Sequence, residues 1–248
     1  MERKTEKKIA VVTGASSGLG LAISKRLLAN GFLVIGISRH PDKGEFDHKS
    51  FLPLKSDLSR PELVKKCSRR IRQEFDRLDL LINNAGTGFF GLHEGIDPDA
   101  IAQMINLNLT APLILTSALL PLLRKAKGHI INISSITAKK PSPMGSAYAA
   151  SKAGLLHFSN SLFEEVRKAG VKVSALCPDI TITHFFDELS FGPSNNEKSY
   201  LTPETVAENL MAIVDQAEHG VVTELVIRPQ IHSIARKKKK VDCKGHAE

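Results

Sequence analysis

The chain has 248 residues, of which 42% are hydrophobic, 24% charged and 5% aromatic, with no Trp. This composition excludes a wholly disordered or fibrous chain and allows a sizeable aliphatic core. The formal net charge is +8, but a net +4 lies in residues 236–248, so a solubilising, disordered tail is favoured over contact with nucleic acid or a membrane surface.

Short aliphatic runs alternate with helix-length stretches from one end of the chain to the other. Helices are expected after residue 18 with a C-cap at Asn30-Gly31, from Pro61 onward, and from Thr202-Pro203 onward. An aperiodic, mobile loop is expected over residues 185–200. Buried strands are expected at Ile9–Val12, Phe32–Ile37, Leu80–Asn83, His129–Ser134, Val171–Cys177 and Val222–Ile227.

This alternation predicts an α/β fold with a doubly wound parallel sheet of Rossmann type and helices on both faces. A single domain is expected over residues 1–235, with a polar N-terminal arm at 1–7 and a basic tail at 236–248. Ligands of such a sheet bind at the carboxyl ends of its strands, where the strand order reverses.

The chain is expected to be cytoplasmic, without an integral membrane segment. The apolar run after MERKTEKK is broken after four residues by Thr13 and Gly14, which is too short for a signal peptide. The stretch Leu107–Leu123 is interrupted by Asn108 and two prolines and is shorter than a bilayer requires. The three cysteines are far apart without a CxxC pair, which is typical of a reducing compartment.

The first strand runs directly into the glycine-rich segment TGASSGLG at 13–20, and a helix follows. Glycines at such a turn let backbone N–H groups approach a pyrophosphate, which the helix N-terminus also favours. The spacing is GxxxGxG rather than GxGxxG. A run of this kind alone is also compatible with an ordinary tight turn, but its place between a strand and an amphipathic helix favours a phosphate site.

Further motifs follow in order: NNAG at 83–86, Asn108 in NLTAP, Ser135 in NISS, Tyr148 and Lys152 in YAASK, and the segment 178–183. Together with TGASSGLG, they resemble the short-chain dehydrogenase/reductase family over about residues 8–230. The resemblance implies the Rossmann fold, a nicotinamide cofactor, and a homo-dimer or homo-tetramer formed through long helices that flank the sheet.

Four residues are candidates for catalysis: Asn108, Ser135, Tyr148 and Lys152. Tyr148 and Lys152 are four positions apart and share one helix face, so the ammonium is expected to lower the phenol pKa from about 10. Tyr148 can then protonate a carbonyl oxygen, or remove the alcohol proton in reverse, while Ser135 hydrogen-bonds the same oxygen. The resemblance places Asn108 at the water that links Lys152 to solvent.

Each of these residues has a structural alternative, since a YxxxK pair can be surface decoration, a Ser can cap a strand and an Asn can satisfy a bent helix. Their combination with the glycine loop favours catalysis. The sequence contains neither a GxSxG elbow nor His/Cys spacing typical of zinc, so no hydrolase site and no metal are expected.

The acidic ribose-binding residue of an NAD site is expected about 20 residues after the glycine loop. Ser38 and Arg39 stand there instead, and a hydroxyl with a guanidinium suits the 2′-phosphate of NADP(H). Asp179 stands where the family has glycine, which puts the local loop geometry in doubt. The full expected cofactor set is Gly14, Ser16, Ser17, Gly18, Leu19, Gly20, Ser38, Arg39, Asp57, Leu58, Asn84, Ala85, Gly86, Tyr148, Lys152, Pro178, Thr181 and Thr183.

The sequence therefore predicts an NADP(H)-dependent oxidoreductase that transfers hydride between the nicotinamide and a small carbonyl or secondary alcohol substrate. The alternative is a regulator or sensor of the same fold that binds NADP(H) without turnover. The substrate is expected to be selected by residues 184–201 and 141–146. The aromatic residues at 185, 186 and 191 fit either an apolar pocket or a lid that packs on its own core.

Overall fold

The computed structural model describes residues 7–44, 46–187, 189, 191–216 and 219–236. Seven parallel strands form one sheet in the order β3-β2-β1-β4-β5-β6-β8. The order reverses between β1 and β4, so the switch point of the sheet lies there. The strands are β1 (Ile9–Thr13), β2 (Leu33–Ser38), β3 (Phe51–Lys55), β4 (Leu80–Asn83), β5 (His129–Ile133), β6 (Lys172–Pro178) and β8 (Glu224–Ile227).

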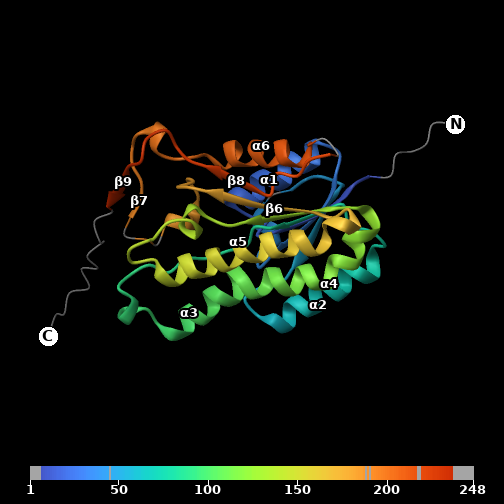
Figure 1. Cartoon of the computed structure of the whole chain (residues 1–248), viewed down its shortest axis with the longest axis horizontal. Helices are drawn as coiled ribbons and strands as arrows, with labels where there is room; N and C mark the ends of the chain where they lie inside the picture. Colours follow the sequence, from blue (N-terminus) through green and yellow to red (C-terminus); the bar gives the residue numbers. More distant parts are fainter. Residues whose placement is uncertain (1–6, 45, 188, 190, 217–218, 237–248) are drawn as a thin grey trace.

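Helices cover both faces of this sheet, as Figure 1 shows. One face carries α1 (Gly18–Ala29) and α6 (Pro203–Val214), and the other carries α2 (Pro61–Glu74), α4 (Ala111–Ala126) and α5 (Ser146–Val166). Helix α3 (Pro98–Ile105) continues into α4 through one π-helical turn, Asn106–Thr110. The predicted fold class, a Rossmann-type parallel sheet between two layers of helices, is confirmed.

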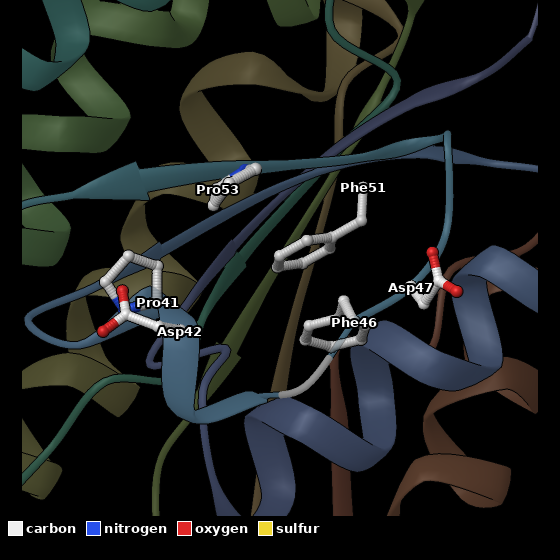
Figure 2. A pocket seen from close by; sticks show the side chains of 6 residues that line it. All are labelled: Pro41, Asp42, Phe46, Asp47, Phe51 and Pro53. Atoms are coloured by element: carbon white, nitrogen blue, oxygen red, sulfur yellow. The ribbon is translucent and has the colours of Figure 1, made fainter.

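In the connection from β2 to β3, the described residues form the 3-10 turn Pro41–Gly44 in place of the usual crossover helix. The edge of the sheet on the α1 side is covered instead by Phe46, whose ring stacks on Phe51 at a centroid distance of 3.7 Å. A pocket of about 550 Å³ remains beside these rings (Figure 2). Asp42 and Asp47 line it, so an anion such as a cofactor phosphate is disfavoured there.

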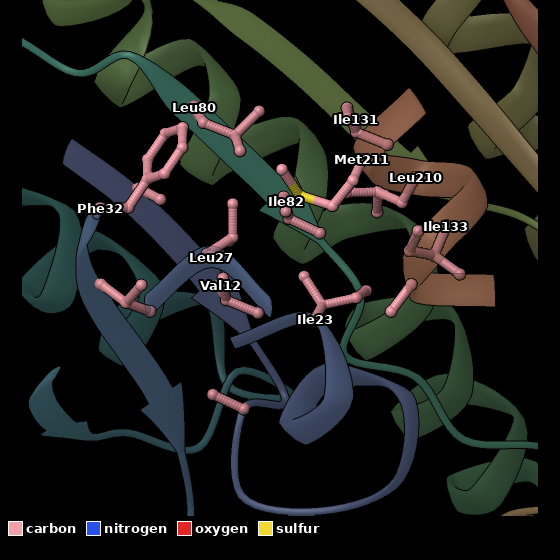
Figure 3. Close-up of a cluster of buried hydrophobic side chains, with 14 of the residues drawn as sticks. Val12, Ile23, Leu27, Phe32, Leu80, Ile82, Ile131, Ile133, Leu210 and Met211 are labelled. Carbon is pink, nitrogen blue, oxygen red and sulfur yellow. The ribbon is translucent and has the colours of Figure 1, made fainter. Parts of the chain in front are cut away.

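Successive residues of the strands point to opposite faces of the sheet and pack into two separate hydrophobic cores. Val12 and Ile82 face α1 and α6, where they pack with Ile23, Leu27 and Leu210 (Figure 3). On the other face, Val11 and Leu81 pack with buried residues of α2, α4 and α5. Both faces of each central strand are apolar, as a parallel sheet covered on both sides requires.

Two expected helix ends are confirmed. Gly31 has φ = 79° directly after the C-cap residue Asn30, a conformation that favours glycine. Thr202 accepts a hydrogen bond from the backbone N–H of Thr205 at 3.1 Å and so caps α6, with Pro203 in the first turn.

The apolar stretch Leu107–Leu123 was expected to be too short to span a bilayer, but the structure places it within one longer helical run, Pro98–Ala126. By length and composition alone, this run could cross a membrane. Leu115, Leu119 and Leu123 are buried against the sheet, which is the packing of a core helix. Length and composition therefore do not exclude a membrane span, and the contacts of these three residues show that one face of the helical run packs in the core of the domain.

The segment 185–200 was expected to be an aperiodic loop, and the structure corrects this. It contains the 3-10 turns His184–Phe186 and Glu197–Ser199 and a short strand, β7 (Phe191–Pro193). Strand β7 pairs antiparallel with β9 (Ile234–Arg236), so Arg236, expected in the tail, belongs to this ribbon. The rest of the predicted tail, 237–248, and residues 1–6 of the predicted arm lie outside the described residues.

Candidate functional site

The predicted cofactor segments, and Ser135 among the catalytic residues, lie at the carboxyl ends of strands in the sheet. The glycine loop follows β1, Ser38 ends β2, Asp57 follows β3, and Asn84 follows β4. Ser135 follows β5, and the segment 178–183 begins at the end of β6. Because the strands are parallel, these segments meet along one edge of the sheet on both sides of the switch point.

The glycine loop is fixed by hydrogen bonds to the neighbouring strands. The Gly14 N–H donates to the Ile37 carbonyl at 2.8 Å, and the Thr13 hydroxyl accepts from the N–H groups of Asn84 and Ala85, each at 2.9 Å. A Cβ at Gly20 would lie only 2.1 Å from the Gly14 carbonyl oxygen. Glycine at position 20 therefore allows α1 to pack directly on the loop.

The N-terminus of α1 is suited to an anion. Its N-cap residue, Ser17, makes no capping hydrogen bond with its side chain, and the first turn contains no acidic residue. The first N–H groups of a helix carry partial positive charge and need acceptors, which phosphate oxygens provide. A Cβ at Gly18 would lie 3.3 Å from the Thr183 side chain, so this helix end adjoins the segment after β6.

Ser38 and Arg39 differ in exposure. Ser38 is buried at the end of β2, and its hydroxyl has no hydrogen-bond partner among the described residues. A buried hydroxyl without a partner is costly, and a ligand oxygen at this position would satisfy it. Arg39 is exposed immediately after it, where its guanidinium is accessible from solvent.

The remaining predicted cofactor residues lie at the same edge with different surroundings. Asp57 is half-buried and accepts from the N–H and hydroxyl of Ser59 at 3.0 and 2.8 Å. The Leu58 side chain packs into the core on the α2 face, which leaves only its backbone for a ligand. The segment after β6 is held by Thr181, whose hydroxyl donates to the Asp179 carbonyl at 3.0 Å.

The four candidate catalytic residues converge in the structure. Tyr148 and Lys152 lie on α5, with the Lys152 ammonium 5.9 Å from the centroid of the Tyr148 ring. The Ser135 side chain lies near enough to Tyr148 to lower the phenol pKa, and its Oγ atom accepts from the Thr137 N–H at 3.1 Å. Lys152 is buried and donates to the Ile133 carbonyl at 2.9 Å. A Cβ at Gly86 would lie 3.4 Å from the Lys152 Nζ atom and 3.2 Å from the Asn108 Oδ1 atom, so these side chains meet at Gly86.

Asn108 sits in the π-helical turn between α3 and α4 and is fully buried. Its amide nitrogen donates to the Thr87 carbonyl at 2.8 Å and to the Ser151 hydroxyl at 3.1 Å. Its amide oxygen accepts from the Thr87 N–H at 2.9 Å. The π-helical turn thus directs the Asn108 side chain toward the loop that follows β4, where Gly86 of the NNAG motif also lies.

The expected lowering of the Tyr148 pKa is not what the structure supports. Desolvation raises the pKa of Tyr148 to about 12, and the nearby Ser135 side chain opposes this only in part. Burial also lowers the pKa of Lys152 to about 8. Desolvation is the largest cause of both shifts, so Tyr148 carries its proton at neutral pH and Lys152 is close to its titration range.

Asp179 has a defined role in holding the site together. Its side chain is buried and accepts from the Ile180 N–H at 2.9 Å and from the Arg228 guanidinium at 3.2 Å. The Lys140 ammonium lies 3.9 Å away. The carboxylate therefore ties the segment after β6 to the segments after β5 and β8, which glycine at this position could not do.

Aromatic rings surround Tyr148. Phe90, from the segment after β4, lies 5.2 Å from the Tyr148 ring, and Phe185 lies 5.7 Å from it. Phe191 of β7 extends the group, at 5.1 Å from Phe90. Phe90 was not among the residues predicted from the sequence, although it lies shortly after β4, a strand that ends at the predicted site.

This parallel sheet, with a glycine loop opening α1 and polar side chains along its carboxyl edge, defines a dinucleotide-binding protein of Rossmann type. A family model described as short chain dehydrogenase matches residues 8–192. The chain therefore belongs to the short-chain dehydrogenase family, and it is an oxidoreductase of that type.

Relatives and solved structures agree with this placement. An uncharacterized oxidoreductase of Staphylococcus aureus (strain MRSA252) is 32% identical over 228 residues, which cover 90% of this chain and 97% of the relative. An alcohol dehydrogenase of the archaeon Thermococcus sibiricus, complexed with 5-hydroxy-NADP, has a TM-score of 0.82 and 25% identity and covers 91% of this chain and 97% of its own. A 4-hydroxyisoleucine dehydrogenase complexed with NADH has a TM-score of 0.80 and 25% identity, covering 90% and 98%. Similar structures thus bind either type of nicotinamide cofactor.

Proposed function

We propose that the protein is an NADP(H)-dependent oxidoreductase that reduces a carbonyl compound to the secondary alcohol, with Tyr148 as the general acid. The observation that carries the proposal is the convergence of Tyr148, Ser135, Lys152 and Asn108 beside the glycine loop. Separate motifs, distant in the sequence, supply a proton donor, a partner for the reacting oxygen, an ammonium and a positioned amide within one site.

The site fits a dinucleotide. The α1 N-terminus and the close packing of Gly20 on Gly14 would hold the pyrophosphate. The unpartnered Ser38 hydroxyl and the exposed Arg39 guanidinium support a 2′-phosphate, because neither would repel it as a carboxylate would. Thr181 and Thr183 would hold the nicotinamide amide. NADP(H) is therefore proposed in preference to NAD(H).

When bound, the cofactor supplies the hydride that the carbonyl carbon accepts. The chain supplies the proton: the Tyr148 phenol donates it to the carbonyl oxygen, and Ser135 hydrogen-bonds that oxygen as negative charge develops on it. The Lys152 ammonium favours the phenolate that results. The Asn108 amide is fixed by Thr87 and Ser151 and lies next to Gly86, where the Lys152 ammonium also lies.

The test is the substitution Tyr148→Phe, with Tyr200→Phe as the matched control, since the chain has two tyrosines. NADPH oxidation is followed by absorbance with a panel of ketones, quinones, keto-acyl thioesters and sugars. Tyr148→Phe is expected to bind NADPH like the wild type and to lose most of kcat, whereas Tyr200→Phe retains it. Equal turnover by the wild type and Tyr148→Phe would refute the mechanism. Absence of turnover in the wild type on the whole panel, with NADPH binding intact, would favour the sensor alternative.

A homo-dimer or homo-tetramer is proposed as the working assembly in the cytoplasm. Only 39% of the most apolar window of Pro98–Ala126 is buried within one chain, so apolar helix surface remains for a second copy to cover. Sedimentation velocity tests this: a monomer at micromolar concentration would contradict it.

A further inference from the structure

We propose that the substrate is an uncharged carbonyl compound with an aromatic ring next to the carbonyl group, bound against Phe90 and Phe185 at Tyr148. This inference rests on the proposed function and specifies its substrate class. It is carried by the rings around Tyr148, by the backbone beneath them and by the charges on the neighbouring segments.

The rings come from three separate parts of the chain and meet at the proposed proton donor. Phe90 and Phe185 each contact Tyr148, and they lie 6.1 Å from each other in an edge-to-face arrangement. Phe186 continues the group, with its ring centroid 5.3 Å from that of Phe185 and 6.0 Å from that of Phe191. Edge-to-face surfaces of this kind favour a further aromatic ring over a saturated group of equal size.

Two glycines bring the rings close to the backbone. A Cβ at Gly88 would lie 2.6 Å from atoms of both Phe90 and Phe185, and a Cβ at Gly145 would lie 2.9 Å from Phe90. Any side chain at these positions would displace the rings. The backbone therefore leaves room for the aromatic group on both sides of Tyr148, through Gly88 in the segment after β4 and through Gly145 at the N-cap of α5.

The exposed side chains beside the aromatic group are apolar as well. Met144 is 58% exposed, and its carbonyl accepts from the Gly91 N–H at 2.7 Å, which places it beside the segment that carries Phe90. Leu92, two residues after Phe90, is 66% exposed. Large apolar side chains left in solvent beside a proposed catalytic group are suited to an apolar ligand.

Basic side chains on the neighbouring segments are already paired with carboxylates. After β5, Lys139 pairs with Glu224 and Lys140 with Asp179. Arg228, after β8, pairs with the same Asp179. Since Lys152 is buried and bonded to a carbonyl, an anionic substrate group would compete with existing interactions. An uncharged substrate has no such requirement.

The experiment compares acetophenone with cyclohexyl methyl ketone, which has the same carbon skeleton without aromaticity. The ratio of their kcat/KM values with NADPH is measured for the wild type, Phe90→Leu, Phe185→Leu and the control Phe163→Leu. Phe163 lies on α5 with its ring 5.0 Å from the Arg167 guanidinium, outside the aromatic group. The ratio is expected to fall about two- to tenfold in the first two variants and to stay unchanged in the control. The differing intrinsic reactivity of the two ketones cancels in this comparison.

A second pair tests charge: methyl 4-acetylbenzoate is expected to be reduced faster than 4-acetylbenzoate. The proposed substrate class is refuted if the acid is preferred, or if the ratio for acetophenone over cyclohexyl methyl ketone falls equally in the Phe163→Leu control. Turnover that depends on Tyr148 would in either case leave the proposed function intact. If no ketone is turned over, calorimetric titration of acetophenone into the NADPH complexes decides. Binding weakened by Phe185→Leu but not by Phe163→Leu supports the aromatic site, and equal or absent binding refutes it.

Discussion

Replacing Arg39 by alanine tests the proposed cofactor preference at the position on which it depends. A charge-assisted, bidentate contact between a guanidinium and a phosphate contributes about 1.5–3 kcal/mol. Arg39 is exposed, so solvent screening puts the expected value at the lower end of this range. Since 1.4 kcal/mol corresponds to a factor of ten, Arg39→Ala is expected to weaken NADPH binding by about tenfold and to leave NADH nearly unchanged.

Ser38→Asp extends the same test. The Ser38 hydroxyl is buried without a partner among the residues that the structure describes, so a carboxylate there would face the same ligand atoms. It would repel a 2′-phosphate and could accept hydrogen bonds from the ribose hydroxyls of NADH. We expect the preference to move toward NADH by more than Arg39→Ala alone moves it. Because the new carboxylate is buried, thermal unfolding of the variant with NADH is measured alongside, to separate altered selectivity from a damaged fold.

The assay is a titration followed by the fluorescence of the reduced nicotinamide, giving dissociation constants for NADPH and NADH at one ionic strength. Arg70→Ala is the matched control, because Arg70 is an exposed arginine on α2 that pairs with Glu74. Its constants should equal those of the wild type. If the wild type binds NADH as tightly as NADPH, or if Arg39→Ala weakens both equally, Arg39 has no role in selectivity.

Three further expectations concern the rest of the site. In reduction at saturating NADPH, kcat is expected to be level near neutral pH and to fall above about pH 8 as the Lys152 ammonium, with its lowered pKa, loses its proton; a level profile to pH 10 would contradict this. Gly20→Ala is expected to destabilise the fold by about 2 kcal/mol or more and to weaken NADPH binding, since its Cβ meets the Gly14 carbonyl, whereas Gly95→Ala, with open space around it, is neutral in urea unfolding. Asp179→Asn is expected to cost about 1 kcal/mol, because its partners Lys140 and Arg228 are well exposed, and to raise the KM for NADPH more than it lowers kcat.

The sheet and its helices could be predicted because each central strand is a continuous aliphatic run with turn residues at both ends. Strand β3 was the exception. It begins with Phe51, contains Pro53 and lies at the sheet edge, where only Phe51 and Leu54 are buried, so its sequence lacks the apolar run of the others. The ribbon of β7 and β9 was missed for a related reason, since its two short strands are separated by about 40 residues and neither has a hydrophobic period.

The positions of the candidate site residues could be predicted from the sequence, but their burial and their interaction partners could not. Spacing placed Tyr148 and Lys152 on one helix face, and that arrangement depends only on helix geometry. The extent of their burial depends on tertiary packing, which the spacing does not contain. The pairing of Asp179 with Arg228, 49 residues later, is equally nonlocal, so from the sequence Asp179 was only a departure from a family pattern.

The desolvation of Tyr148 and Lys152 also determines which protonation state each direction of the proposed reaction uses. A phenol whose pKa is raised to about 12 holds its proton at neutral pH, so it is prepared to act as an acid toward a carbonyl oxygen. The reverse reaction requires the phenolate, which this environment disfavours, while an ammonium with a pKa near 8 gives it only partial support as the pH rises. Within the proposed function, the protonated phenol is therefore the form that donates to the carbonyl oxygen at neutral pH, and oxidation of the alcohol draws on the phenolate form, whose population rises with pH.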